Sequence, residues 1–261
     1  MNQITQSDIN TSFEQEINLW KIIGNQTCSD ILKVVAEQIT TDGLEENTLI
    51  ALIGKPNSGK RTFSLALNNT LCFEFKETLG DTLAFGGDDI FRYFKEGNEE
   101  TTYFINNASN INRFAQTIIY RIIRQNKLRN NIPFEDKPEI IPIHNRLIIL
   151  SSNNTDRIVQ PLQNTIKMKC YLQDRLPQND IFQILKQRCQ YLGWELENEE
   201  IIYNIVAVAI DVSQALNILE FTYRLMKNNN DSIIKVDHLN RCLRLLNQNH
   251  QIKKITDELM V

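Results

Sequence analysis

A glycine-framed loop at residues 54–62 limits the fold of this chain more than any other segment. It reads Gly-Lys-Pro-Asn-Ser-Gly-Lys-Arg-Thr, follows the apolar run 49–53, and precedes a helix-like run that ends at Asn69. Two glycines separated by four residues let the backbone fold around a phosphate with its N–H groups pointing inward. The following helix adds positive partial charge at its N-terminus, and Lys60 reaches the outer phosphates. The pattern therefore predicts a phosphate-binding loop between a buried strand and a helix.

One position of this loop departs from the usual pattern. The residue after the lysine is normally Ser or Thr, whose hydroxyl holds a magnesium ion, and here it is Arg61. Thr62 comes one residue later, and one residue on a helix turns a side chain by about 100°. Arg61 is either a fixed positive charge near the metal position or an exposed helix residue. We therefore expect the loop to fold as usual and the metal chemistry to be impaired.

The composition excludes several broad classes of protein. The 261 residues can hold one large or two modest domains, and 42% hydrophobic with 23% charged residues is ordinary for a soluble globular protein. A net charge of −4 argues against broad coating of nucleic acid and leaves room for a local basic face. No apolar run approaches the roughly 20 residues that span a bilayer. The first residues lack the apolar core of a signal peptide, so we expect a cytoplasmic protein.

The cysteines do not suggest a metal site or a disulfide framework. The chain has five of them, scattered and without a CxxC pair: Cys28, Cys72, Cys170, Cys189 and Cys242. Buried reduced thiols are the expected state.

Apolar patterning in the first two thirds of the chain predicts an α/β domain. Short apolar runs are typical of buried parallel strands at 49–53, 101–105 and 147–150, with a further strand expected at 71–75 and a loop at 80–87. Helical spacing is seen at 28–39, 88–95 and 114–125. The segment 126–145, which contains three prolines, is expected to be a β-hairpin or a loop. Alternating strands and helices indicate a doubly wound fold.

The pattern changes after this domain. Four helical segments follow without an intervening strand, at 180–192, 198–210, 213–226 and 236–246. We expect a flexible arm at 1–17, an α/β nucleotide-binding core at 18–174, and a small all-helical lid domain at 175–261.

A phosphate-loop core followed by a helical lid is the plan of AAA+ proteins, and this chain most resembles RuvB, the motor of Holliday-junction branch migration. Residues 20–26, Trp-Lys-Ile-Ile-Gly-Asn-Gln, resemble that family's adenine-side segment. Residues 127–145 resemble its presensor hairpin in position and length. Residues 160–163 are similar to its Ser-Pro-Leu-Arg, and residues 212–214 to its Thr-Pro-Arg. The likeness runs from about residue 18 to 258 and rests on order and spacing more than on identical letters.

The resemblance implies a site whose chemical groups have changed. The family's Asp-Glu pair, which holds magnesium and polarises water, falls on Asn106 and Asn107, and an amide cannot act as a general base. Its arginine finger falls on Gln163 and the lid's sensor arginine on Gln214, although Arg157 is an alternative finger and otherwise a solvated loop residue. The polar sensor keeps suitable chemistry at Ser152 or Asn153. Misalignment would need separate errors at five positions while the surrounding segments stay in register. The candidate nucleotide-binding residues are Ile22, Ile23, Gly54, Pro56, Asn57, Ser58, Gly59, Lys60, Arg61 and Thr62.

The resemblance also implies ligands and partners. We expect weak binding of ATP or ADP, with magnesium unlikely to take part. The hairpin at 127–145 would meet other AAA+ subunits or a RuvA-like protein, in a homo- or hetero-oligomer. The family's DNA-binding winged-helix domain would follow the lid, but the sequence ends at Val261.

Three functional hypotheses follow. The first is a pseudo-ATPase that acts through protein contacts in DNA recombination, repair or replication. The second is an active ATP-driven Holliday-junction motor with divergent residues, and the third is a clamp-loader-like AAA+ subunit.

Overall fold

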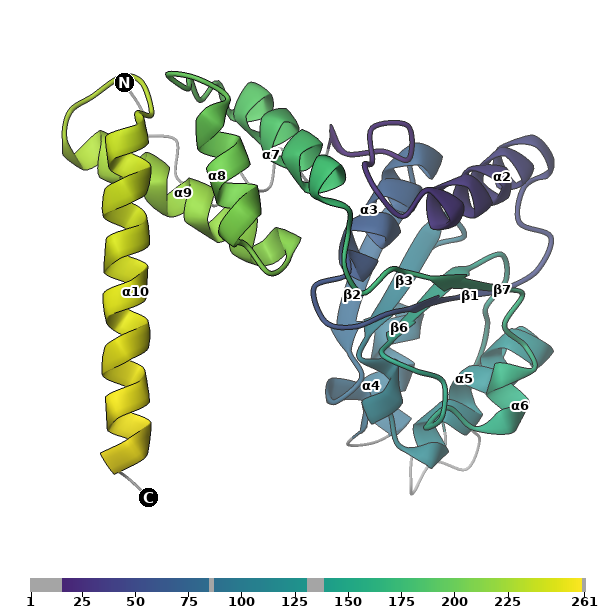
Figure 1. Cartoon of the computed structure of the whole chain (residues 1–261). Helices are drawn as coiled ribbons and strands as arrows, with labels where there is room; N and C mark the ends of the chain where they lie inside the picture. The colour runs from purple at the N-terminus through teal and green to yellow at the C-terminus, as the bar shows by residue number, and fades with distance from the viewer. Residues whose placement is uncertain (1–15, 85–86, 131–138, 260–261) are drawn as a thin grey trace. The chain divides into compact units, whose positions relative to one another are not determined.

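The protein is described by a computed structural model that covers residues 16–84, 87–130 and 139–259 (Figure 1). The chain forms two compact units, which divide between Asp174 and Arg175. Most of the expected arm, residues 1–15, lies outside the described residues.

The first unit is built on a parallel sheet of five strands in the order β2-β3-β6-β1-β7. Its strands are β1 (Thr48–Ile53), β2 (Glu74–Leu79), β3 (Thr101–Asn106), β6 (Leu147–Ser152) and β7 (Met168–Tyr171). Its helices are α2 (Gln26–Asp42), which precedes the first strand, α3 (Lys60–Leu71), α4 (Gly87–Lys95), α5 (Arg113–Gln125) and the short α6 (Gln160–Gln163), with two 3₁₀ turns at Thr82–Ala84 and Ala108–Asn110. The predicted α/β class is confirmed.

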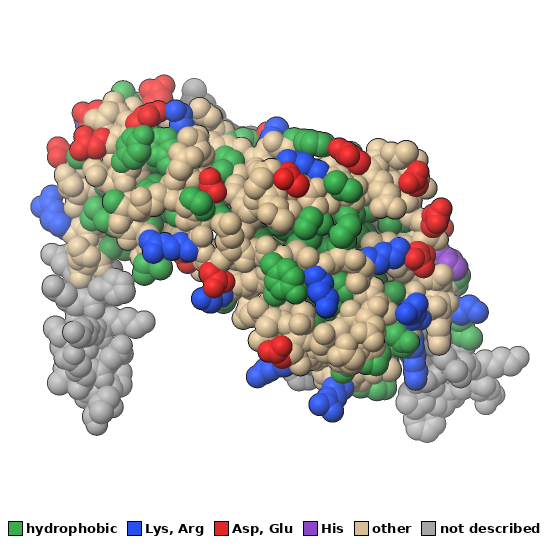
Figure 2. All heavy atoms as spheres, turned by 45° about the vertical axis from the view of Figure 1, so that its right-hand side comes forward, with side chains coloured by type: hydrophobic (Ala, Val, Ile, Leu, Met, Phe, Trp, Pro, Cys, Tyr) green, Lys and Arg blue, Asp and Glu red, His purple; other side chains and the backbone are tan. Residues whose placement is uncertain are grey.

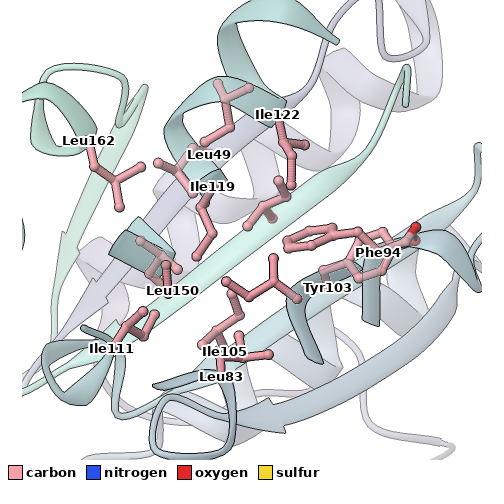
Figure 3. Packing of buried hydrophobic residues seen from close by; sticks show 14 of the residues in the cluster. Leu49, Leu83, Phe94, Tyr103, Ile105, Ile111, Ile119, Ile122, Leu150 and Leu162 are labelled. Carbon is pink, nitrogen blue, oxygen red and sulfur yellow. Dashed lines mark hydrogen bonds between the residues drawn. The ribbon is translucent and has the colours of Figure 1, made fainter. Parts of the chain in front are cut away.

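Helices cover both faces of this sheet because its central strands are apolar on both sides. Alternate residues of a strand point to opposite faces. In β1, Leu49 packs into a core with α4 and α5, whereas Ile50 packs into a second core with α2 and α3. Figure 3 shows the first core, in which Ile119 and Ile122 of α5 meet residues of the sheet.

The structure corrects the prediction at the edges of the sheet. The strand expected at 71–75 is displaced: α3 continues to Leu71, and β2 begins at Glu74. β2 reads Glu-Phe-Lys-Glu-Thr-Leu and has no fully buried residue, because it lies at the edge of the sheet. The other edge strand, β7, was not predicted at all. The loop expected at 80–87 contains the first 3₁₀ turn, and its residues 85–86 lie outside the described residues.

The segment 126–145 forms the expected hairpin. Strands β4 (Lys127–Asn130) and β5 (Glu139–Pro142) pair antiparallel, with Lys127 opposite Pro142. Its tip, residues 131–138, lies outside the described residues.

The second unit is helical, as expected. It contains α7 (Gln178–Leu192), α8 (Glu200–Val208), α9 (Val212–Asn228) and α10 (Val236–Leu259). They enclose a separate apolar core that includes Leu185, Ile205 and Leu219. In the described part of the chain, no helix is both long and apolar enough to cross a membrane.

Candidate phosphate-binding site

The loop between β1 and α3 has the geometry that its glycines require. Gly59 has a φ of 94°, in the region that favours glycine. A Cβ at Gly54 would stand 2.7 Å from Ser58 Oγ and 3.1 Å from Leu172 Cβ, so a side chain there would displace the Ser58 hydroxyl. Asn57 is also left-handed, with a φ of 64°, and Pro56 is exposed beside it. The predicted strand, loop and helix are therefore present with a tightly folded loop.

Lys60, the first residue of α3, turns back onto this loop. Its Nζ donates hydrogen bonds to the carbonyl oxygens of Gly54, at 2.5 Å, and of Lys55, at 2.6 Å. The residue is only 8% exposed, and burial lowers the pKa of its ammonium group. The ammonium group therefore occupies the loop through contacts with the backbone.

Arg61 has a specific partner. Its Nε donates to Glu77 Oε2 of β2 at 2.8 Å, a charge-assisted hydrogen bond between α3 and the edge of the sheet. The sequence left two descriptions of Arg61 open, a fixed charge near the metal position and an exposed helix residue. The second is incomplete, because the carboxylate of Glu77 holds the guanidinium. Thr62 is exposed.

The two asparagines after β3 differ in what they contact. Asn106 Oδ1 accepts hydrogen bonds from Ser151 Oγ, at 2.6 Å, and from the backbone N–H of Asn107, at 3.0 Å. Asn107 is exposed, and its φ of 55° puts it in the left-handed region, which asparagine tolerates better than most residues. The Asn106 side chain thus joins the ends of β3 and β6.

The end of β6 meets the start of the loop. The N–H of Gly54 donates to the carbonyl of Ser152 at 3.1 Å. Ser152 is buried, and its hydroxyl donates to the carbonyl of Asn154. Asn153 is exposed. Of the two sensor candidates, Asn153 is therefore the one whose side chain faces solvent.

Gln163, at the end of α6, is turned toward its own loop. Its Nε2 donates to the carbonyl oxygens of Thr155, at 2.8 Å, and of Ile158, at 2.7 Å. The amide NH₂ group of Gln163 therefore makes both hydrogen bonds, which hold the segment 155–163 together. The side chain of Arg157, the alternative finger, is exposed in the same segment.

Gln214 belongs to the second unit and caps α9. The Asp211 side chain accepts from the N–H of Gln214 at 2.8 Å, and Gln214 Oε1 accepts from the N–H of Ile210 at 2.6 Å. This reciprocal arrangement is close to a capping box, which satisfies N–H groups at the start of a helix. The Gln214 side chain therefore acts here through its carbonyl oxygen, which accepts a hydrogen bond.

Asn25 is a residue of this region that the sequence did not single out. It is 5% exposed, its Nδ2 donates to the carbonyl of Ser58 at 3.4 Å, and its Oδ1 accepts from the N–H of Gln173 at 2.6 Å. It also begins α2 with a φ of 49°. The neighbouring Ile22 and Ile23 are half-buried, and Ile22 packs against the core on the α2 side. The sequence signals were its place in the segment 20–26, which resembles the adenine-side segment, and an asparagine after Gly24 at a helix start.

The structure thus brings together part of the predicted set. The loop residues Gly54, Ser58 and Lys60 lie at the carboxyl ends of β1 and β6, with the Asn106 side chain bonded to the neighbouring Ser151. This end of a parallel sheet is where α/β proteins bind ligands. Arg61 and Gln163 instead bond to Glu77 and to loop carbonyls, as described above.

The comparisons with known proteins identify the fold. The Thermotoga maritima RuvB Holliday junction branch migration motor superposes with a TM-score of 0.72 at 16% sequence identity, covering 90% of this chain and 74% of that chain. Two single-residue mutants of the same RuvB give TM-scores of 0.74 and 0.73, both at 17% identity, covering 90% and 88% of this chain and 74% and 73% of theirs. No protein-family model matches the sequence, and no curated protein does. The chain therefore has the fold of this RuvB, with an α/β core followed by a helical region.

Proposed function

We propose that this chain is a RuvB-like AAA+ pseudo-ATPase, which binds nucleotide weakly and hydrolyses it negligibly. It acts as a subunit or regulator in DNA recombination, repair or replication, with an AAA+ core at 18–174 and a lid at 175–261, and works in the cytoplasm. The observation that carries the proposal is the pair of hydrogen bonds that the Asn106 side-chain oxygen accepts. The position that should hold a metal-binding carboxylate bears an amide whose oxygen is already bonded to Ser151 and to the Asn107 N–H.

The neighbouring positions support the same conclusion. Magnesium prefers carboxylates, phosphates and water, and neither the guanidinium of Arg61 nor a neutral amide replaces them. A glutamate in place of Asn107 would adopt a left-handed backbone, which costs a residue other than Gly, Asn or Asp on the order of 1–3 kcal/mol. We therefore propose that ATP or ADP binds without magnesium.

Weak nucleotide binding rests on what the loop keeps. Its backbone N–H groups and the start of α3 bind phosphate without any of the changed side chains. Asn25 ties the segment that would lie beside the adenine to Ser58 of the loop. The β4–β5 hairpin would contact another AAA+ subunit or a RuvA-like protein.

Steady-state ATPase measurement tests the proposal. The wild-type chain should show negligible turnover, because both the metal-holding and the water-polarising carboxylates are missing. A magnesium-dependent rate above about 0.1 per second, abolished by Lys60→Ala, would contradict it, since enzymes run at roughly 1–10³ per second.

The retained loop keeps a second candidate open, an active motor with divergent residues. Turnover of the wild type separates the two, and the Asn106→Asp, Asn107→Glu double variant, assayed beside it, shows whether the two carboxylates add to that turnover. A pseudo-ATPase is inactive before the change, whereas a motor that uses other residues is already active. A clamp-loader-like subunit would be distinguished by the proteins that co-purify with it.

A further inference from the structure

The outer face of α5 carries a row of arginines. Successive helix residues are about 100° apart, so Arg113, Thr117, Arg121 and Arg124 fall within an arc of roughly 80°. All four are exposed, and the opposite face, with Ile119 and Ile122, is buried against the sheet (Figure 3). From Arg113 to Arg124 the helix rises about 16 Å. Several successive phosphate groups of a nucleic-acid strand span a distance of this order.

The charge of this row is poorly compensated. Between Glu100 and Glu135 the sequence has no acidic residue but has Arg113, Arg121, Arg124, Lys127 and Arg129, in a chain whose net charge is −4. In the part of the chain that the structure describes, neither Arg113 nor Arg121 pairs with a carboxylate. The pKa of the Glu46 carboxyl is lowered mainly by Lys167, and the charge of Arg124 adds a smaller effect in the same direction. Figure 2 shows Lys and Arg side chains gathered over the lower part of the α/β unit.

An exposed aromatic ring adjoins the row. Phe114 is 63% exposed and falls about 20° from Arg121 around the helix. The exposed Lys127 follows α5 directly, after the left-handed Asn126 ends the helix. Cations that track a backbone, beside an aromatic ring on which a base can stack, are the two elements of single-strand binding.

We propose that the outer face of α5, continued at Lys127, binds the phosphate backbone of single-stranded nucleic acid, with Phe114 stacked on a base. The proposal deepens the function proposed above by giving the chain a direct nucleic-acid contact within its core. It does not depend on nucleotide binding or on ATP turnover. An acidic protein would satisfy the arginines equally but gives the exposed ring no specific role.

The test is fluorescence anisotropy of the full chain with a labelled oligonucleotide of about 20 nucleotides, over salt concentrations from about 50 to 300 mM. The triple variant Arg113→Gln, Arg121→Gln, Arg124→Gln should reduce the slope of log K against log salt by about 2, and should weaken binding about 100-fold near 0.1 M salt. Phe114→Ala should weaken binding about tenfold and leave the slope unchanged, because stacking carries no charge.

The matched control is Arg224→Gln, Arg241→Gln, Arg244→Gln, which removes the same charge from exposed positions of the helical unit. The proposal predicts that this control keeps the wild-type slope and that both triple variants keep the wild-type circular dichroism. Equal losses in the two triple variants would overturn it, because net charge alone would then explain binding. So would equal competition by a polyglutamate peptide of the same charge, or tighter binding to a duplex that Phe114→Ala leaves unaffected. ATP turnover, measured on the same preparations, reports separately on the pseudo-ATPase.

Discussion

Ser151 donates its hydroxyl to Asn106 Oδ1 at 2.6 Å, so the polar side chain at the end of β3 is held through its acceptor atom. The second bond to this oxygen comes from the N–H of Asn107. A carboxylate oxygen could accept both bonds, whereas an apolar side chain could accept neither.

We therefore expect Asn106→Asp to be tolerated. Its free energy of unfolding should change by less than about 1 kcal/mol, while Asn106→Leu, of similar size, should lose about 1–3 kcal/mol because it leaves two donors unpaired. Urea unfolding followed by circular dichroism measures both. Equal losses in the two variants would mean that the acceptor has no role in stability.

Lys60→Ala should abolish the remaining nucleotide binding. Compared with the intact site of the family named in the proposal, the loss of a magnesium-holding hydroxyl at position 61 and of a charge-assisted hydrogen bond at position 214, each taken as about 1.5–3 kcal/mol, should weaken binding by about 10²–10⁴. We expect sub-millimolar or weaker affinity in the wild type, little difference between ADP and ATP, and no effect of magnesium. Calorimetry with each nucleotide, with and without magnesium, checks this. Tight magnesium-dependent ATP binding would show that Arg61 leaves the metal position free, and no heat at millimolar nucleotide would leave the loop as a structural remnant.

Position 163 should tolerate a substitution by arginine but not one by glutamate. Gln163 Nε2 donates to two carbonyl oxygens, and a guanidinium can donate to both. Gln163→Glu removes the donors and places a negative charge against those carbonyls, so it should cost about 1–3 kcal/mol. Chemical unfolding of the two variants makes the comparison, and a stable Gln163→Glu would refute the assigned contacts.

Gln214 should show the opposite preference. Its Oε1 accepts the N–H of Ile210, so Gln214→Glu keeps the cap and adds a favourable negative charge at the start of α9. Gln214→Arg removes the acceptor and adds a positive charge there, and should cost about 1–2 kcal/mol. Thermal melting of both variants tests the order, and greater stability of the arginine variant would be inconsistent with the cap.

Stability should fall in acid partly through Asp231. A hydrogen bond from Lys235, with a further one from the buried His238, lowers the pKa of the Asp231 carboxyl below its ordinary value of 3.8. A group whose pKa is lowered in the folded state stabilises the fold above its unfolded pKa and loses that contribution as pH falls through the folded pKa. The melting temperatures of wild type and Asp231→Asn should therefore differ at neutral pH and converge below about pH 4. A difference that persists unchanged to pH about 2 would exclude this assignment.

The sequence predicted the centre of the fold better than its edges. β1, β3 and β6 are buried on both faces and each contains an uninterrupted apolar run, so their positions were clear. β2 has only two apolar residues, Phe75 and Leu79, and contains Lys76 and two glutamates, because an edge strand is covered less completely. β7 has one buried residue, Cys170, and is too short to give a pattern.

The contacts of the site were less predictable than its loop. The spacing of Gly54, Gly59 and Lys60 determined the loop, because local sequence controls that geometry. The pairing of Arg61 with Glu77 joins residues 16 positions apart, and Asn25 meets Gln173 across 148 positions. Such long-range contacts depend on how the elements pack and leave no periodic signal. The hydrogen-bond roles of the two glutamines, with Gln163 donating and Gln214 accepting, likewise depend on the folded structure and not on a sequence pattern.

The position of Lys60 has a kinetic consequence. With its ammonium group bonded to the carbonyl oxygens of Gly54 and Lys55, an arriving anion must exchange for two existing hydrogen bonds to gain this charge. Association would then occur in two steps, and its observed rate would level off at high ligand concentration at the rate at which the side chain turns outward. That limiting rate would be the same for ADP, ATP and inorganic phosphate, because it is a property of the loop before any ligand arrives.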